Sequence, residues 1–364
     1  MGWLTLGLAL AVTGCATEGR SAARDEVLQK YRAAANAMHG ARFAEAKPLL
    51  DDVLMTLDGL TAGDRTARKA RGTFHAESSK NFRGEPYERV MAYYYRGILY
   101  WLDGQPDNAR ACFKNAQLQD ADAESNQYQA DYVVLDYLEG LVAAKLGGDG
   151  QDGWKRARAH ARLGIPPEYD PQANVLVFFE TGTGPRKYAG GEHGEQLRFS
   201  PGSSHADRIR IKMEGIGTEA RAWDDLSWQA TTRGGRVMDH VLKNKAVFKD
   251  ATDTFGNVAL ISGGALAIAG GGHHGPADEI GVGLLAAGLL SKVISAAVTP
   301  QADTRQWDNL PNLLGFASLR AAPGQHHLVA EFVDPAGRVT LTRDATFTVV
   351  PGGPDIVIFF SDHL

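Results

Sequence analysis

The spacing of apolar residues changes once along the chain. Over residues 25–165 they recur every three or four positions, with Ala, Leu, Glu, Lys and Arg between them, which predicts amphipathic helices. After residue 170 the period shortens to two, in runs such as DRIRIKMEG and GRVTLTRDATFTVV, which predicts β-strands. Pro166 and Pro167 mark the change, because proline ends helices. We therefore expect a helical domain over 25–165 and a β-rich domain over 170–364.

One helical stretch, VMAYYYRGILYWLDGQPDNARACFKNAQLQDAD, has the spacing of a helical hairpin. It resembles a tetratricopeptide repeat (TPR), a helix–turn–helix unit of about 34 residues. In such a unit small residues let the two helices approach, aromatic residues fill the groove between them, and a glycine lies at the turn. The positions expected to pack in this way are Gly97, Tyr100, Gly104, Ala109, Phe113 and Ala116. Weaker matches around Phe43 and Gly140 predict three hairpins stacked as a TPR-like α-solenoid.

The β-rich domain contains an unusual insert at residues 257–299. Its two uncharged apolar runs, 258–272 and 280–291, flank a polar hinge, and neither reaches the roughly 18 residues of a membrane-spanning helix. Its glycines favour close helix packing, so we expect a helical hairpin lying on the body, in the membrane or against a second copy. The expected fold class is α+β: an N-terminal TPR-like α-solenoid followed by a small antiparallel β domain with an inserted Gly-rich helical hairpin.

The chain starts with MGWLTLGLALAVTGCATEGRS. Its apolar run of about ten residues is too short to span a bilayer but suits a secretory signal. The ending Val12-Thr13-Gly14-Cys15 resembles the lipobox of bacterial lipoproteins, in which the cysteine is acylated after cleavage before it. The resemblance implies a signal peptide at 1–14, a lipidated Cys15 and a linker at 15–24. Residues 1–19 contain no Lys or Arg, unlike most such signals, so an ordinary buried N-terminus is the alternative.

Composition narrows the function classes. The net charge of −5 comes with no basic block, which argues against nucleic-acid binding because that depends on clustered Lys and Arg. The two cysteines are Cys15 and Cys112. If Cys15 carries lipid, no intramolecular disulfide forms and Cys112 is a small buried apolar residue.

Two groups of residues are candidates for binding. Charged and aromatic side chains gather at one expected helix start, where capping also explains the acids and core packing also explains the tyrosine. They form a candidate partner-binding surface: Arg83, Glu85, Glu88, Arg89 and Tyr94. The run GTGPRK predicts a β-turn with two exposed cations, Arg186 and Lys187, as a candidate loop contact. It lacks the spacing of a phosphate-binding loop.

The sequence offers no catalytic or metal-binding motif. The pairs His273-His274 and His326-His327 are adjacent, whereas neighbouring residues on a strand point apart. H-E-x-x-H, G-x-S-x-G and C-x-x-C are all missing. We therefore expect no catalytic residues, no metal and no cofactor, and we expect the segment around Arg305 and Trp307 to form an interdomain contact.

Three stretches carry a wider resemblance: FRGEPYERVMAYYYRGILYWLDGQPDNARACFKNAQ, VLVFFETGTGPRK and ADTRQWDNLP. Together they resemble a family of uncharacterised bacterial envelope lipoproteins with TPR-like repeats, often encoded beside the lipoprotein that activates penicillin-binding proteins. The resemblance implies a role in the cell envelope and supplies no catalytic residues.

Two functions follow from these patterns. The first is a lipid-anchored periplasmic scaffold or adaptor that binds a partner protein through residues 85–135 without catalysis. The second is a cell-wall glycan-binding module or cell-wall-modifying enzyme, which requires a cleft with carboxylates of perturbed pKa. Ala16 after Cys15 favours an outer-membrane location facing the periplasm, by resemblance to enterobacterial sorting, and leaves inner-membrane anchoring open. The expected partners are an envelope protein and the membrane, with the oligomeric state open.

Overall fold

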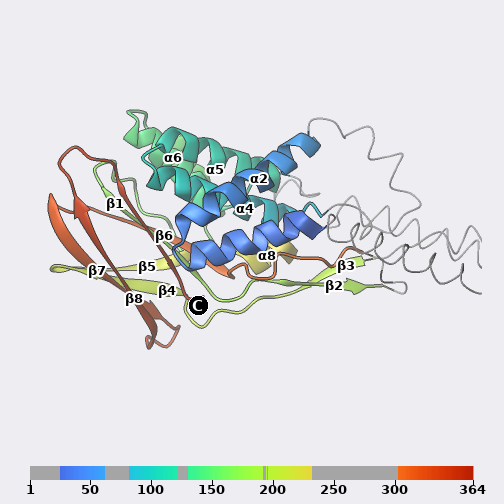
Figure 1. Ribbon diagram of the computed structural model, residues 1–364. Coiled ribbons are helices and arrows are strands. Elements are labelled where there is room, and N and C mark those ends of the chain that lie inside the picture. Colours follow the sequence, from blue (N-terminus) through green and yellow to red (C-terminus); the bar gives the residue numbers. More distant parts are fainter. Residues whose placement is uncertain are drawn as a thin grey trace, which may run out of the picture.

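The computed structural model describes residues 25–61, 82–121, 130–191, 194, 196–231 and 302–363. Within them a layer of helices lies against a strongly curved β-sheet, and strands β2 and β3 lie at the end opposite β7 and β8 (Figure 1). The predicted signal peptide 1–14, Cys15, the linker 15–24 and the insert 257–299 lie outside the described residues.

Most helices come from the first half of the chain. In order they are residues 25–39, α2 (Phe43–Thr61), α4 (Pro86–Leu102), α5 (Pro106–Asp120), α6 (Val133–Lys145), α7 (Gln151–His160) and the short α8 (Leu226–Thr231). Both α4 and α5 begin with proline, which suits a first helical turn because its missing N–H needs no partner there. The pairs α4–α5 and α6–α7 pack as hairpins, as the apolar spacing indicates.

The strands form one large sheet and one small hairpin. Their bounds are β1 (Val175–Thr181), β2 (Arg186–Gly190), β3 (Gln196–Ser200), β4 (Arg208–Met213), β5 (Ile216–Asp225), β6 (Leu313–Leu319), β7 (Gly324–Val333), β8 (Val339–Val349) and β9 (Ile356–Ser361). The large sheet has the order β8-β7-β4-β5-β6-β1-β9, and β2 pairs with β3 alone. Neighbours in the large sheet are antiparallel except β1 and β9, which are parallel.

The sheet is buried on two sides where it meets the helices. Along β1, Leu176 and Phe178 belong to the hydrophobic cluster shared with the helices. Val177 and Phe179 belong to a second cluster enclosed by the curved sheet itself. Because side chains of a strand alternate between faces, β1 can separate two cores only as a continuous apolar run, which VLVFF supplies.

The expected fold class is wrong. Among the described residues seven strands form one mixed sheet, and its end strands β8 and β9 come into contact, so that the sheet is nearly barrel-shaped. The helices pack on this sheet instead of preceding a small antiparallel domain as a free solenoid. The physical reason lies in α4, which is buried almost all round and therefore has neighbours on nearly every side.

The segment before β6 fills the contact between helices and sheet, as expected for Trp307. The ring centre of Trp307 lies 4.3 Å from that of Tyr31 in helix 25–39 and 6.0 Å from that of Tyr95 in α4. The expected contact is therefore confirmed, although it lies within one shared core.

Candidate functional site

The two charged regions selected from the sequence are joined by one buried ion pair. Lys187 of β2 places its ammonium nitrogen 2.6 Å from a carboxylate oxygen of Glu88 near the start of α4. The other oxygen of Glu88 accepts a hydrogen bond from the backbone N–H of Trp307 (2.6 Å). Both charged side chains are buried. The prediction that they are exposed is therefore wrong, since they connect α4, β2 and residues 302–308.

Further bonds surround this pair. Burial raises the pKa of Glu88, and the Lys187 ammonium opposes that rise. Lys187 also donates to the backbone oxygen of Arg305 (2.9 Å) and lies 5.4 Å from the centre of the Phe82 ring. Glu88 accepts a bond from the backbone N–H of Glu85 (2.6 Å), the capping contact expected at this helix start. Such extra bonds are what a buried ion pair requires.

Tyr94 cannot serve as a partner-binding side chain either. It is buried, with its ring centre 5.9 Å from that of Tyr95 and 6.4 Å from that of Phe178 in β1. The candidate surface role of Tyr94 is wrong and the alternative of core packing holds, because three consecutive tyrosines of α4 all lie within the core.

The remaining members of the predicted surface are at least partly exposed. Arg83, Glu85 and Arg89 are half-buried at the start of α4, and Arg89 donates to the side chain of Gln119 in α5 (2.7 Å). Arg186 is exposed on β2. These residues lie around the buried ion pair, so the structure brings the two predicted regions to one end of the molecule.

The residues expected to pack the α4–α5 hairpin lie between its two helices. A Cβ added to Gly97 would lie 2.5 Å from the Phe113 ring, so this close crossing depends on glycine. Gly104 occupies the turn with φ +71°, which glycine adopts readily. Tyr100 is half-buried beneath the guanidinium of Arg96, 3.6 Å from its ring centre. The fully buried members are Ala109, Phe113 and Ala116.

Glycines also set the approach of α6 and α7. A Cβ on Gly140 would lie 2.0 Å from the hydroxyl of Tyr169 and 2.6 Å from the backbone oxygen of Gly150. A Cβ on Gly153 would lie 2.6 Å from the backbone oxygen of Asp136. The two helices can therefore touch backbone to backbone, with the Tyr169 hydroxyl wedged against α6.

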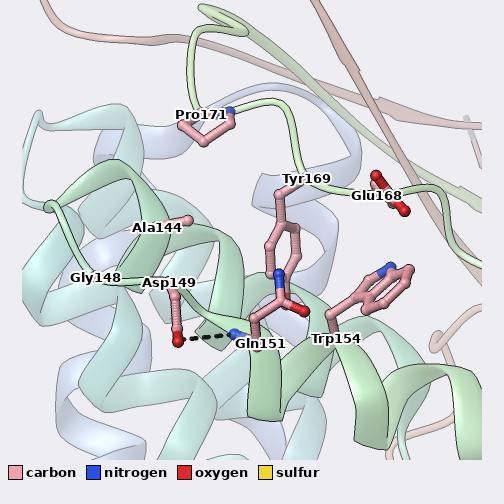
Figure 2. Close-up of a pocket in the computed structure, with 8 residues that line it drawn as sticks. All are labelled: Ala144, Gly148, Asp149, Gln151, Trp154, Glu168, Tyr169 and Pro171. Carbon is pink, nitrogen blue, oxygen red and sulfur yellow. Dashed lines mark hydrogen bonds between the residues drawn. The ribbon is translucent and has the colours of Figure 1, made fainter.

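A pocket of about 220 Å³ opens beside this contact, where α6 ends and α7 begins. Figure 2 shows Tyr169 at its centre with Gln151 in front of it and Trp154 to one side. The indole N–H of Trp154 donates to the backbone oxygen of Pro167 (3.0 Å), which fixes that ring. The lining consists of Ala144, Gly148, Asp149, Gln151, Trp154, Glu168, Tyr169 and Pro171.

A buried carboxylate that sequence reasoning missed lies at the end of β1. Glu180 accepts a hydrogen bond from the hydroxyl of Tyr95 (2.7 Å), and Nε2 of His39 lies 2.7 Å from its other oxygen. Burial alone would raise the pKa of Glu180, but His39 and Tyr95 hold it below its ordinary value. The His363 ring stacks on His39 at 4.5 Å. The sequence signal for Glu180 was a single acid at the end of the apolar run NVLVFFE. The bonds of Glu180 join the helices to β1.

A second missed carboxylate, Asp224 of β5, caps α6. Its two oxygens accept hydrogen bonds from the backbone N–H groups of Val133 (3.0 Å) and Val134 (2.7 Å). Burial raises the pKa of Asp224 to about 7. The side chain comes from a strand about ninety residues away in sequence, so no local capping pattern announces it.

The histidine pairs do not converge. His326 pairs with Glu214, whereas Nε2 of His327 lies 3.2 Å from Asp344. The pair at 273–274 lies outside the described residues. Across the described ranges, no three His, Cys, Asp or Glu side chains gather as metal ligands. In the same part of the chain, no helix combines the length and apolar character that a membrane span requires.

Comparisons of the chain with protein-family models, with curated proteins and with solved structures return no match. The candidate sites are therefore the end of the molecule around the buried Glu88–Lys187 pair and the pocket between α6 and α7, each defined by this chain's own contacts.

Proposed function

We propose that the protein is a lipid-anchored adaptor of the cell envelope, facing the periplasm, that holds a partner protein without transforming it. The observation that carries the proposal is a set of contacts around Asp25, the tenth residue after Cys15. Arg305 pairs with Asp25 (2.7 Å), and its guanidinium lies 5.7 Å from the centre of the Phe82 ring. The backbone N–H of Ala302 donates to the oxygen of Gly194 (2.9 Å). Asp25, Phe82 and Arg305 thus lie together beside Lys187, at one end of the molecule, which we call the tethered end.

The tethered end faces the membrane in this proposal. The lipobox residue Cys15 precedes Asp25 by about ten residues, which span at most roughly 35 Å when fully extended. The apolar insert 257–299 joins the body between Thr231 of α8 and Ala302. Asp25, which follows the proposed acyl anchor, and Ala302, which follows the insert, both lie at this end. By its resemblance to sorting signals, Ala16 favours the outer membrane.

The pocket lies away from the tethered end. Helix α6 begins beside α8, where Gln229 donates to Asp131 (2.7 Å), and its 13 residues extend about 20 Å to the pocket. A partner in the periplasm can approach that side while the tethered end stays at the membrane.

The buried carboxylates also support a binding role. Glu88, Glu180 and Asp224 each accept hydrogen bonds that connect a helix to the sheet or to residues 302–308. Their perturbed pKa values follow from burial within these connections, and such connections give a rigid body suited to holding a partner.

The experiment compares the wild type with Cys15→Ser in cells fed a labelled fatty acid. We expect the wild type to carry label and to fractionate with membranes, and the variant to carry none. Crosslinking in intact cells, followed by capture of the protein, is expected to recover one recurring envelope protein with the wild type. An unlabelled wild type found in the cytosolic fraction, or turnover of cell-wall glycan by the purified protein, would contradict the proposal.

A further inference from the structure

The pocket between α6 and α7 combines aromatic and acidic groups. Its lining contains the rings of Trp154 and Tyr169 and the carboxylates of Asp149 and Glu168. The amide of Gln151 adds a further polar group, and the lining includes no Lys, Arg or His. The carboxylates and the aromatic faces therefore both favour a positively charged occupant.

The aromatic walls are fixed before any ligand arrives. The ring centre of Tyr169 lies 4.8 Å from that of Tyr137, and its hydroxyl is wedged against Gly140. Trp154 is held by its bond to Pro167, and Arg158 lies over its ring at 4.7 Å. Because these rings do not need to be ordered on binding, a ligand loses little affinity to their immobilisation.

The cations near the pocket have partners of their own, and Arg158 is the one that lies over the Trp154 ring. The Lys145 ammonium donates to the backbone oxygens of Pro171 (3.3 Å), which lines the pocket, and of Ala173, and it also donates to Asp355 (2.9 Å). Arg156 pairs with Asp136 (2.8 Å) and Glu139 (3.2 Å). Among the described residues no cation forms an ion pair with Asp149 or Glu168, which are both exposed, so their negative charge stays available to a partner.

The size of the pocket limits what it can hold. At about 220 Å³ it is smaller than the roughly 300–1,000 Å³ of typical small-molecule sites. One extended side chain fits such a volume better than a sugar chain or a large cofactor. We propose that this pocket receives a single Lys or Arg side chain of the partner protein. The inference rests on the proposed function, because it names the chemistry by which that partner is recognised.

The test titrates the full-length lipidated protein in detergent with N-acetyl-arginine methylamide and with its uncharged isostere, N-acetyl-citrulline methylamide. The indole N–H of Trp154 is the reporter, read by NMR and assigned with Trp154→Phe. We expect the arginine probe to shift this signal and the citrulline probe to bind at least tenfold more weakly. The double variant Asp149→Asn/Glu168→Gln is expected to lose about tenfold in affinity, whereas the exposed control Glu26→Gln keeps it.

Other outcomes overturn the proposal in distinguishable ways. Equal binding of both probes would show that charge is not recognised, and a shift with N-acetylglucosamine alone would assign the pocket to a glycan. No shift with any probe would remove the pocket as a recognition site. Capture of the crosslinked partner by Asp149→Asn/Glu168→Gln at the wild-type level would also refute it while leaving the adaptor function standing. An arginine-specific shift without any captured partner would contradict the adaptor function instead.

Discussion

Replacing Asp224 by asparagine is expected to change how the stability of the protein depends on pH. The carboxylate is fully buried and accepts two backbone N–H bonds at the start of α6. Burial raises its pKa from 3.8 to about 7 despite those bonds. Native Asp224 therefore keeps its proton up to about pH 7, whereas the unfolded chain releases it near pH 4. Stability is lost as the pH rises through this range, because the native state must either hold a proton or bury a charge.

The size of the effect follows from the pKa shift. A difference of about three pKa units corresponds to about 4 kcal/mol of lost stability once the pH exceeds the native pKa. Between pH 5 and pH 8 the loss is about 3 kcal/mol. Asparagine has a similar shape and no charge, so Asp224→Asn loses about 1 kcal/mol of capping at every pH and escapes the pH-dependent penalty.

The assay is urea unfolding at pH 5 and pH 8, followed by tryptophan fluorescence, for which the neighbouring Trp223 is a reporter. Other groups titrate in this range, including His160, whose pKa is raised by the Asp136 carboxylate 3.8 Å away. They contribute alike to both proteins and cancel in the difference. We expect the free energy of unfolding of Asp224→Asn, relative to the wild type, to improve by about 3 kcal/mol between pH 5 and pH 8. Parallel pH profiles would refute the reasoning.

Other substitutions test the packing. Gly97→Ala is expected to lower the free energy of unfolding by about 1–3 kcal/mol, because the new Cβ meets the Phe113 ring. This loss remains although alanine favours a helix over glycine by about 1 kcal/mol. Adding Phe113→Leu to the same chain should recover part of the loss, measured by thermal melting. Lys187→Met leaves Glu88 buried without its cation and should cost about 3–5 kcal/mol, whereas the double variant Glu88→Gln/Lys187→Met should be less destabilised in urea unfolding. Gly140→Ala should unfold at a lower temperature than the wild type. It should also disturb the pocket, which would appear as a shift of the Trp154 indole N–H signal in the NMR spectrum.

The spacing of apolar residues predicted the helices and strands but not how they pack together. The spacing in α4 and α5 placed a hairpin with Gly97 at its crossing, because residues three and four apart share a helix face. The period-two runs found β4, β7 and β8 for the same kind of reason. Periodicity carries no information about which strands pair, so the parallel contact of β1 with β9 and the packing of the helices on the sheet were missed.

The charged residues show a second limit. Glu88 and Lys187 were selected as surface charges because each lies in a locally polar stretch. Their pairing joins positions 99 residues apart, and only the fold brings them within 2.6 Å. The sequence did not indicate a role for Glu180 or Asp224, because each lies at the end of a strand among apolar residues. Their hydrogen-bond donors come from helices far away in the sequence. The pocket lined by Trp154 and Tyr169 could not be predicted from the sequence. It exists only because glycines let α6 and α7 approach closely, and no local sequence pattern indicates that approach.

The central claim is that the tethered end of the molecule lies at the membrane. The direct measurement uses two single-label variants of the lipidated protein with Cys112→Ala, carrying a fluorophore at Tyr188→Cys on β2 or at Ile216→Cys on β5, both at exposed positions. Ile216 pairs with Met213, which in turn pairs with Leu328 of β7, and β7 lies at the end opposite β2 (Figure 1). In vesicles containing brominated lipid, the account predicts quenching of the label at 188 and little quenching at 216. Equal quenching at both positions, or stronger quenching at 216, would contradict it.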